Sequence, residues 1–343
     1  MTRRSIAVVT GASGGVGRAT ARTFAAAGFD VALVARGDGG LEAAVKDVES
    51  TGAHALAICA DVSDYKEVDA AANQVELDLG PIDVWINDAM TTIFAPSWDI
   101  APDDFQRAVE VTFLGQVWGT MAALERMRPR DHGCIINVGS ALAYMGIPLQ
   151  AAYCSSKFAC RGFFESVRAE ILHSGSNVRL GMVHLPAVNT PQFDWCETTM
   201  DRHPQPVPPI YQPEVAARAI LDAALTGRRT KVVGSWNKLL VVAGSLFPGL
   251  GNNYAAIGAW ESQLTELPIS AHREANLHSP VDDLGDFGAH GIFDNRAGGA
   301  LDRSFLRSLP EVAWTFAIAW RRTIEDKAKR WIKTGALKLT GLR

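Results

Sequence analysis

The chain has 343 residues, of which 48% are hydrophobic and 20% are charged, and its formal net charge is −4. These proportions are typical of a folded globular protein and exclude a disordered or low-complexity chain. Residues 321–343 carry a net +6 and residues 1–320 a net −10, which excludes a nucleic-acid-binding surface on the main body.

Short apolar segments alternate with segments of helical periodicity along the first 235 residues. The strand-like segments are 6–10, 31–35, 54–60, 82–87, 134–138, 178–184 and 231–233. The helical segments are 18–27, 41–50, 66–79, 102–127, 151–173 and 213–226. Such alternation predicts a parallel sheet with helices on both faces. We therefore expect a Rossmann-like, doubly wound α/β domain of seven strands over residues 1–235 and a C-terminal extension over residues 236–343.

A glycine-rich turn joins the first strand to the first helix. The segment TGASGGVG places Gly11, Gly15 and Gly17 at this junction. Glycine allows the backbone to turn tightly and to approach a diphosphate, whose charge is met by the amides at the start of the helix. Because the turn follows the first strand, it predicts a dinucleotide site rather than an ordinary loop.

The ends of the next three strands carry candidate cofactor contacts. An acidic residue after the second strand would bind a ribose 2′-hydroxyl, but here Arg36 follows Ala35, which favours a 2′-phosphate and therefore NADP over NAD. Asp61, with Val62, follows the third strand, where either adenine contact or a helix cap is consistent with the spacing. Asn87 ends the fourth strand, near the expected ribose.

A tyrosine and a lysine stand four residues apart in the segment YCSSK. At this spacing Tyr153 and Lys157 share one face of a helix. The ordinary pKa of a phenol is ~10, and a nearby cation lowers it, so the pair can transfer a proton. Ser140 ends the preceding strand and can bind the same substrate oxygen.

With these motifs, residues 5–235 resemble the classical short-chain dehydrogenase/reductase family. The resemblance implies that Ser140 orients the substrate carbonyl or hydroxyl, that Tyr153 is the general acid/base, and that Lys157 lowers its pKa and binds the nicotinamide ribose. It also implies hydride transfer between nicotinamide C4 and the substrate carbon. The cofactor-binding residues that it implies are Gly11, Ser13, Gly15, Val16, Gly17, Arg36, Asp61, Val62, Asn87, Ala89, Tyr153, Lys157, Val188 and Thr190.

The sequence departs from the family pattern at three places. NDAM (87–90) replaces the usual NNAG, so an amide and a glycine are absent. Thr112 stands where the family has an asparagine that organises a water chain to the lysine. Its hydroxyl either serves this catalytic role or binds a backbone carbonyl one helical turn back. The usual PG pair is Leu185-Pro186, which leaves a plain turn as the alternative to cofactor contact by Val188 and Thr190.

An aromatic segment follows the sixth strand, where relatives carry a mobile lid of about residues 191–212. Phe193 and Trp195 in this lid, together with Leu142, are the candidate substrate contacts. With the uncharged stretch 239–260, they favour an apolar ketone, aldehyde or sterol-like alcohol. That stretch contains a proline and four glycines, so a hydrophobic flap or buried hairpin is favoured over a transmembrane span.

The end of the extension predicts a basic amphipathic helix. Trp320, Ile324 and Trp331 share one face, with lysines and arginines around it. Two alternatives remain open, which are peripheral membrane contact and docking on the acidic body or on another subunit.

Five cysteines without regular spacing indicate free thiols, and no clustered His/Cys pattern predicts a metal site. The apolar run at the N-terminus is too short for a signal peptide, so we expect a cytoplasmic protein with a membrane-associated form as the alternative.

The expected activity is an NADP-dependent interconversion of an alcohol and a carbonyl, by a homo-oligomer (a dimer or tetramer) that pairs through the helices at 102–127 and 151–173. The alternative is an NADP-binding regulatory or scaffold protein with weak or no catalysis.

Overall fold

Seven parallel strands form the central sheet of the molecule, as the sequence predicts. The computed structural model describes residues 3–246, 258–270, 273–281 and 285–298, together with Ala317, Arg321 and Glu325. The strands of the sheet follow the order β10-β7-β6-β4-β1-β2-β3. Their bounds are β1 Ile6–Thr10, β2 Asp30–Ala35, β3 Ala55–Cys59, β4 Val84–Asn87, β6 Cys134–Ser140, β7 Arg179–Leu185 and β10 Thr230–Val232.

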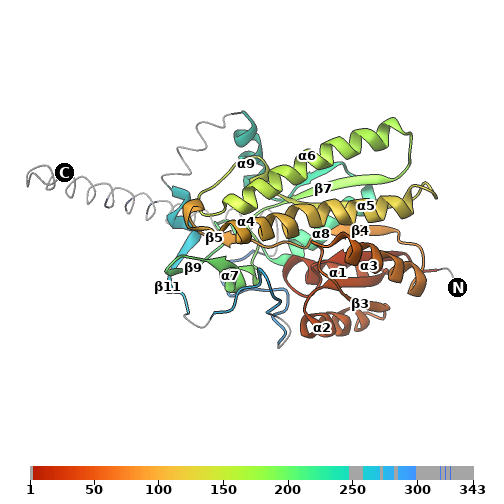
Figure 1. Ribbon diagram of the computed structural model, residues 1–343, viewed down its shortest axis with the longest axis horizontal. Helices are drawn as coiled ribbons and strands as arrows, with labels where there is room; N and C mark the ends of the chain where they lie inside the picture. Colours follow the sequence, from red (N-terminus) through yellow and green to blue (C-terminus); the bar gives the residue numbers. More distant parts are fainter. Residues whose placement is uncertain are drawn as a thin grey trace, which may run out of the picture.

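Helices cover both faces of this sheet (Figure 1). One face packs against α1 (Gly15–Ala26), α2 (Asp38–Glu49) and α8 (Pro213–Thr226). The other packs against α3 (Tyr65–Asp78), α5 (Gly115–Met127) and α6 (Ala151–His173). Strand β1 is apolar from Ile6 to Val9 because both of its faces are buried. Ala7 and Val9 pack on the face covered by α1, α2 and α8, and Ile6 and Val8 pack on the opposite face.

The helix expected over residues 102–127 is interrupted. It consists of α4 (Pro102–Val109), a π-helical turn η2 (Glu110–Leu114) and α5. Thr112 lies in this turn, and its hydroxyl is bonded to the backbone of Thr91. A π-turn inserts one extra residue per turn, which periodicity along the sequence does not reveal, and such turns are frequent at functional sites.

The order of the strands places the site at the carboxyl ends of the central strands. The chain proceeds outward from β1 through β2 and β3, and then returns to β4 on the other side of β1. At such a switch point the connections leave in opposite directions and open a crevice at the carboxyl ends of the strands. The glycine-rich turn, Arg36, Asn87 and Ser140 all stand at or beside these ends.

The predicted lid contains short elements and joins the extension. Its parts are α7 (Gln192–Trp195), β8 (Glu197–Thr198) and β9 (Arg202–Pro204). Strand β8 pairs with β5 (Ile93–Phe94), and β9 pairs with β11 (Leu264–Pro268) of the extension. The lid is therefore held on one side by the main domain and on the other by the extension.

The extension begins with α9 (Ser235–Leu246), so the first part of the uncharged stretch 239–260 is helical. Residues 247–257 of that stretch, and the predicted tail helix apart from Ala317, Arg321 and Glu325, lie outside the described residues. Within the described part of the chain, none of the helices is both long and apolar enough to cross a membrane. All five cysteines are free thiols.

Two further segments of the extension, residues 273–281 and 285–298, run across the carboxyl edge of the sheet, and we call them the strap. Gly15 N donates to Gly288 O at 3.1 Å, and Arg18 forms an ion pair with Asp286 at 2.9 Å. Asn189 donates to Asp294 at 2.8 Å. The strap thus contacts the glycine-rich turn and the loop after β7.

Candidate active site

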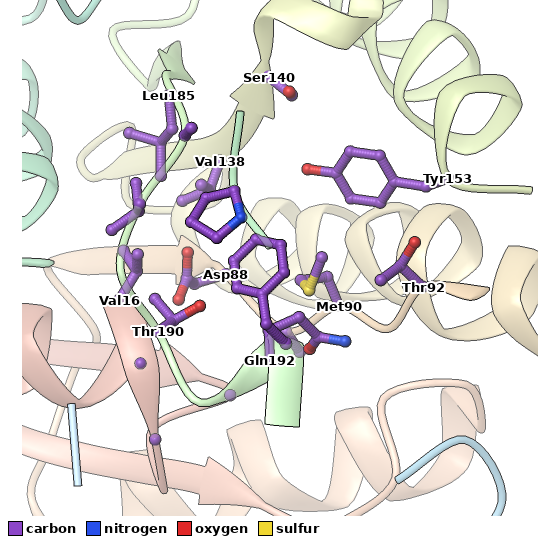
Figure 2. A pocket seen from close by; sticks show the side chains of 18 of the residues that line it. Val16, Asp88, Met90, Thr92, Val138, Ser140, Tyr153, Leu185, Thr190 and Gln192 are labelled. Carbon is purple, nitrogen blue, oxygen red and sulfur yellow. The ribbon is translucent and has the colours of Figure 1, made fainter. Parts of the chain in front are cut away.

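One cavity of about 350 Å³ collects most of the residues that the sequence singled out. Figure 2 shows Ser140 and Tyr153 on one side of it, Val16 and Thr190 on the other, and the carboxylate of Asp88 between them. The predicted site residues that line it are Gly11, Ser13, Gly15, Val16, Arg36, Asp61, Val62, Ala89, Ser140, Leu142, Tyr153, Lys157, Val188, Thr190, Phe193 and Trp195.

The glycines of the turn allow a backbone path and a close approach that other residues would not. Gly11 and Gly15 have φ angles of 70° and 56°, in the left-handed region that favours glycine. A Cβ atom on Gly17 would lie 2.1 Å from Gly11 O. Helix α1 begins at Gly15 and has no acidic residue in its first turn, so its amides and dipole favour an anion. A dinucleotide diphosphate therefore fits this cradle.

At the far end of the cavity, Asp61 forms one polar cluster with Arg36 and Arg107. Asp61 accepts hydrogen bonds from Ser63 N at 2.9 Å and from the Arg107 guanidinium. Burial tends to raise the pKa of Asp61, but the bonds from Ser63 and Arg107 outweigh it and hold the pKa below its usual value. The cap of α3 is Asp64, which accepts from Lys66 N, so the helix-cap alternative for Asp61 is not what the structure shows.

Ser140, Tyr153 and Lys157 meet where β6 ends and α6 begins. Ser140 Oγ accepts from Leu142 N at 3.1 Å and lies on the same side of the cavity as Tyr153, and the Lys157 ammonium lies 5.6 Å from the centroid of the Tyr153 ring. Lys157 Nζ donates to Val138 O at 2.9 Å, and burial lowers the pKa of this ammonium. Burial also raises the pKa of the Tyr153 phenol, which the neighbouring Ser140 hydroxyl only partly offsets. The lowered phenol pKa expected from the sequence is not seen in this arrangement, because desolvation dominates.

Behind Ser140, a buried histidine holds the end of β6. His184 Nδ1 lies 3.1 Å from Ser140 O, and its Nε2 lies 3.2 Å from the Tyr144 hydroxyl. Because a carbonyl only accepts, Nδ1 carries the proton and Nε2 accepts from Tyr144. Burial lowers the pKa of His184 to about 4, so the imidazole is neutral near pH 7.

Thr112 does not line this cavity. Its hydroxyl donates to Thr91 O at 2.7 Å and accepts from Thr91 N at 3.0 Å, and the residue is fully buried. Of the two roles that the sequence left open, a catalytic hydroxyl or a hydroxyl bonded to a backbone carbonyl, the structure shows the second. The carbonyl belongs to a neighbouring loop rather than to the preceding helical turn.

Asn87 and Gly17 also lie behind the cavity wall. Asn87 accepts from Trp85 Nε1 at 2.7 Å and donates to Asn137 Oδ1 at 2.8 Å, so its amide joins β4 to β6 inside the fold. Its expected contact with the ribose is not a feature of this arrangement. Gly17 supports the turn from within, through its close approach to Gly11.

Asp88 is a site residue that sequence reasoning noted only as a departure from the family pattern. Its side chain is 9% exposed and faces the cavity, and its backbone N donates to Thr10 Oγ1 at 3.0 Å. Burial raises the pKa of this carboxyl to about 7, while the nearby Lys157 lowers it. The aspartate in NDAM was the signal in the sequence that could have identified this site residue, because it places a carboxyl beside the glycine-rich turn.

The outer part of the cavity is apolar. Leu142 and Phe193, two of the predicted substrate contacts, line the cavity with Ile147 and Trp236, whereas the third, Trp195, lies against Gly14 of the glycine-rich turn. Phe193 also packs on Phe94, with ring centroids 5.9 Å apart. Trp236 comes from α9 and Asn276 and Val281 come from the strap, so the extension supplies part of the wall. No motif in the sequence marks these extension residues.

Known proteins resemble this chain in sequence and in fold. The family profile described as "short chain dehydrogenase" matches residues 5–199. An uncharacterized oxidoreductase of Bacillus subtilis is 32% identical over 83% of this chain and 81% of its own length. The 3-dehydrosphinganine reductase of Danio rerio is 31% identical over 66% of this chain and 70% of its own length.

Solved structures of similar fold include complexes with NADP and with NAD. A metagenomic short-chain oxidoreductase in complex with NADP is 25% identical and has a TM-score of 0.56. The match covers 67% of this chain and 95% of that one.

Proposed function

This chain belongs to the short-chain dehydrogenase/reductase family, and within it we propose an NADP(H)-dependent oxidoreductase that interconverts an apolar alcohol and its ketone or aldehyde. The observation that carries the proposal is one cavity in which Ser140, Tyr153 and Lys157 face the glycine-rich turn. When bound, the nicotinamide cofactor supplies or accepts the hydride.

The protein's own residues perform the proton chemistry. A carbonyl oxygen between Ser140 and Tyr153 receives a hydrogen bond from each hydroxyl, which stabilises the negative charge that develops there during reduction. Tyr153 then gives its proton to that oxygen. Because burial raises the pKa of the phenol, Tyr153 is protonated near neutral pH, which suits a proton donor and therefore the reductive direction.

The preference for NADP rests on Arg36 and not on the relatives. Arg36, and not a carboxylate, follows Ala35 at the end of β2, and its Nη1 lies 4.0 Å from the Asp61 carboxylate. A guanidinium there binds a 2′-phosphate through charge-assisted hydrogen bonds.

An apolar substrate follows from the lining of the outer cavity. Leu142, Ile147, Phe193 and Trp236 line the same cavity as Ser140. Burying apolar substrate surface there contributes roughly 25 cal/mol per Å². One relative, from Danio rerio, is named 3-dehydrosphinganine reductase.

The test follows NADPH absorbance with a panel of apolar ketones and aldehydes, next to small polar carbonyl compounds of equal reactivity. We expect turnover of apolar compounds and a loss of roughly 100-fold or more in Tyr153→Phe. Tyr65→Phe is the control, since Tyr65 lies at the start of α3, outside the cavity lining. Equal inactivity of wild type and Tyr153→Phe, with NADPH bound, would favour the scaffold alternative instead.

We also propose a homo-oligomer that pairs through α5 and α6. Met121 on α5 and Phe158 on α6 are both 45% exposed, and Leu172 on α6 is 63% exposed. Large apolar side chains on neighbouring helices are typical of a surface that a second copy covers.

A further inference from the structure

Asp88 has a buried carboxyl to which the proton chemistry at Tyr153 gives no role. The residue follows β4 and lines the same cavity as the glycine-rich turn. A Cβ atom on Gly17 would lie 3.1 Å from Asp88 Oδ2, so the carboxyl stands beside the first turn of α1. Figure 2 shows it between Thr190 on one side of the cavity and Tyr153 on the other.

The surroundings of this carboxyl compensate little for its burial. Within the described part of the chain, its oxygens have no hydrogen-bond or ion-pair partner. Two titratable groups of α6 interact with it over a longer distance, the ammonium of Lys157 and the phenol of Tyr153. On the α1 side, the Arg18 guanidinium is paired with other carboxylates. Burial therefore prevails and raises the pKa of Asp88 to about 7.

A bound dinucleotide would bring further negative charge to this place. The amides that suit a diphosphate begin at Gly15, two residues before Gly17. Like charges held close together in a buried site disfavour each other, so an ionised carboxyl and a diphosphate compete. A protonated carboxyl carries no charge, and its O–H can donate a hydrogen bond to an oxygen acceptor. The neutral acid is therefore the form of Asp88 that suits a bound dinucleotide.

We propose that Asp88 is a cofactor-binding residue that holds the dinucleotide as a neutral acid, by donating its O–H to a dinucleotide oxygen beside the glycine-rich turn. When Asp88 is ionised beforehand, binding takes up one proton from the solvent, which forms the O–H bond of the carboxyl. This rests on the proposed function but needs only the dinucleotide and not its 2′-phosphate, so it does not depend on the preference for NADP.

The affinity for the cofactor then depends on pH in one direction. A group with a higher pKa in the complex than in the free protein favours binding at low pH and opposes it above its free pKa. With a pKa of about 7 in the free protein, we expect NADPH to bind at least ~10-fold more weakly at pH 9 than at pH 7. A 2′-phosphate has its second pKa at about 6 and stays ionised across this range.

Asp88→Asn is the variant that tests this, because it keeps a hydrogen-bond donor and cannot ionise. An asparagine is also the usual residue here in the NNAG pattern of the family, so the substitution suits the fold. We expect the variant to lose most of the change in affinity between pH 7 and pH 9. Lys157 is present in both proteins, so their difference isolates Asp88.

Calorimetry measures the proton uptake itself. NADPH, whose reduced nicotinamide carries no charge, is titrated into the full chain at pH 8 in two buffers of different ionisation enthalpy, and NADH is titrated in parallel. We expect the wild type to take up roughly 0.5 to 1 proton per cofactor and Asp88→Asn almost none. Asp78→Asn is the matched control, since Asp78 is exposed and lies outside the cavity lining, and it should behave as the wild type.

A second pH keeps the inference open to refutation even where the variant does not bind. At pH 6 Asp88 is already protonated, so the uptake measured with NADH should fall toward zero in the wild type. Equal uptake at pH 6 and pH 8 would overturn the inference.

The remaining outcomes separate this inference from the proposed function. If neither NADPH nor NADH binds the wild type, both are refuted. If NADH binds and NADPH does not, the preference for NADP is refuted and the inference is decided on NADH. Binding without proton uptake in the wild type, or with the same uptake in Asp88→Asn, would overturn the inference and leave the proposed function intact.

Discussion

Asp88 offers a direct test of how burial in the cavity raises the pKa of a carboxyl and thereby changes stability with pH. Its carboxyl is 9% exposed, and burial raises its pKa from 3.8 to about 7. Between these two values the folded protein binds one more proton than the unfolded chain, so stability falls as the pH rises through this window and stays low above it. Asp88→Asn has nearly the same shape and no titration, and it should remove this dependence.

The size of the effect follows from the two pKa values. With 3.8 for the unfolded chain and about 7 for the folded protein, Asp88 lowers the free energy of unfolding by about 2.5 kcal/mol more at pH 8 than at pH 5. We therefore expect Asp88→Asn to gain about that much relative to the wild type between the two pH values.

Urea unfolding at pH 5 and pH 8 measures this gain as a difference between proteins, so other titrating groups cancel. The exposed Asp78, near the end of α3, provides the control variant Asp78→Asn, which should follow the wild type at both pH values. If the difference between Asp88→Asn and the wild type were the same at pH 5 and pH 8, the carboxyl would not be desolvated as described.

Three further expectations concern residues outside the reacting groups. Thr112→Val leaves two buried backbone groups of Thr91 unpaired and should lower the free energy of unfolding by roughly 2 kcal/mol or more, whereas Thr112→Ser should not; thermal denaturation that ranks Val and Ser alike would contradict this. The pKa of His184 is lowered from 6.5 to about 4, so the wild type loses about 2 kcal/mol between pH 7 and pH 5, where only the unfolded chain takes up the proton. His184→Asn should lack this loss in urea unfolding, and an unchanged pH dependence would argue against a buried neutral imidazole. Phe158→Glu should reduce the mass measured by light scattering to that of one chain, whereas Leu225→Glu on α8 should not; an unchanged mass would exclude this face of α6 as the contact.

The parts of the site that the sequence predicted depend on local spacing. Tyr153 and Lys157 are one helical turn apart, and Gly11, Gly15 and Gly17 belong to one turn, so a few neighbouring residues determine where they lie. The five inner strands β7, β6, β4, β1 and β2 were predictable for a related reason, because each is short, mostly apolar and buried on both faces, whereas the edge strands β3 and β10 are more exposed.

The parts that were missed depend on contacts distant in the sequence. Arg36 meets Asn276 across 240 positions of the chain, and no spacing rule connects them. The partner of Thr112 is Thr91, on another loop, and the π-turn that carries Thr112 interrupts a helix whose apolar pattern looks continuous. The pKa of Tyr153 could not be judged from YCSSK, because the depth of burial, and not the nearby ammonium, determines its direction.

The hydrogen bond from Gly15 N to Gly288 O has a kinetic consequence. That amide is among the first of α1, where a diphosphate would be received, and it already has a protein partner. Binding there must exchange a carbonyl for an oxyanion, whereas release lets the carbonyl return. A dinucleotide would therefore reach this amide only after the strap carbonyl has left it, which couples cofactor loading to the opening of this contact.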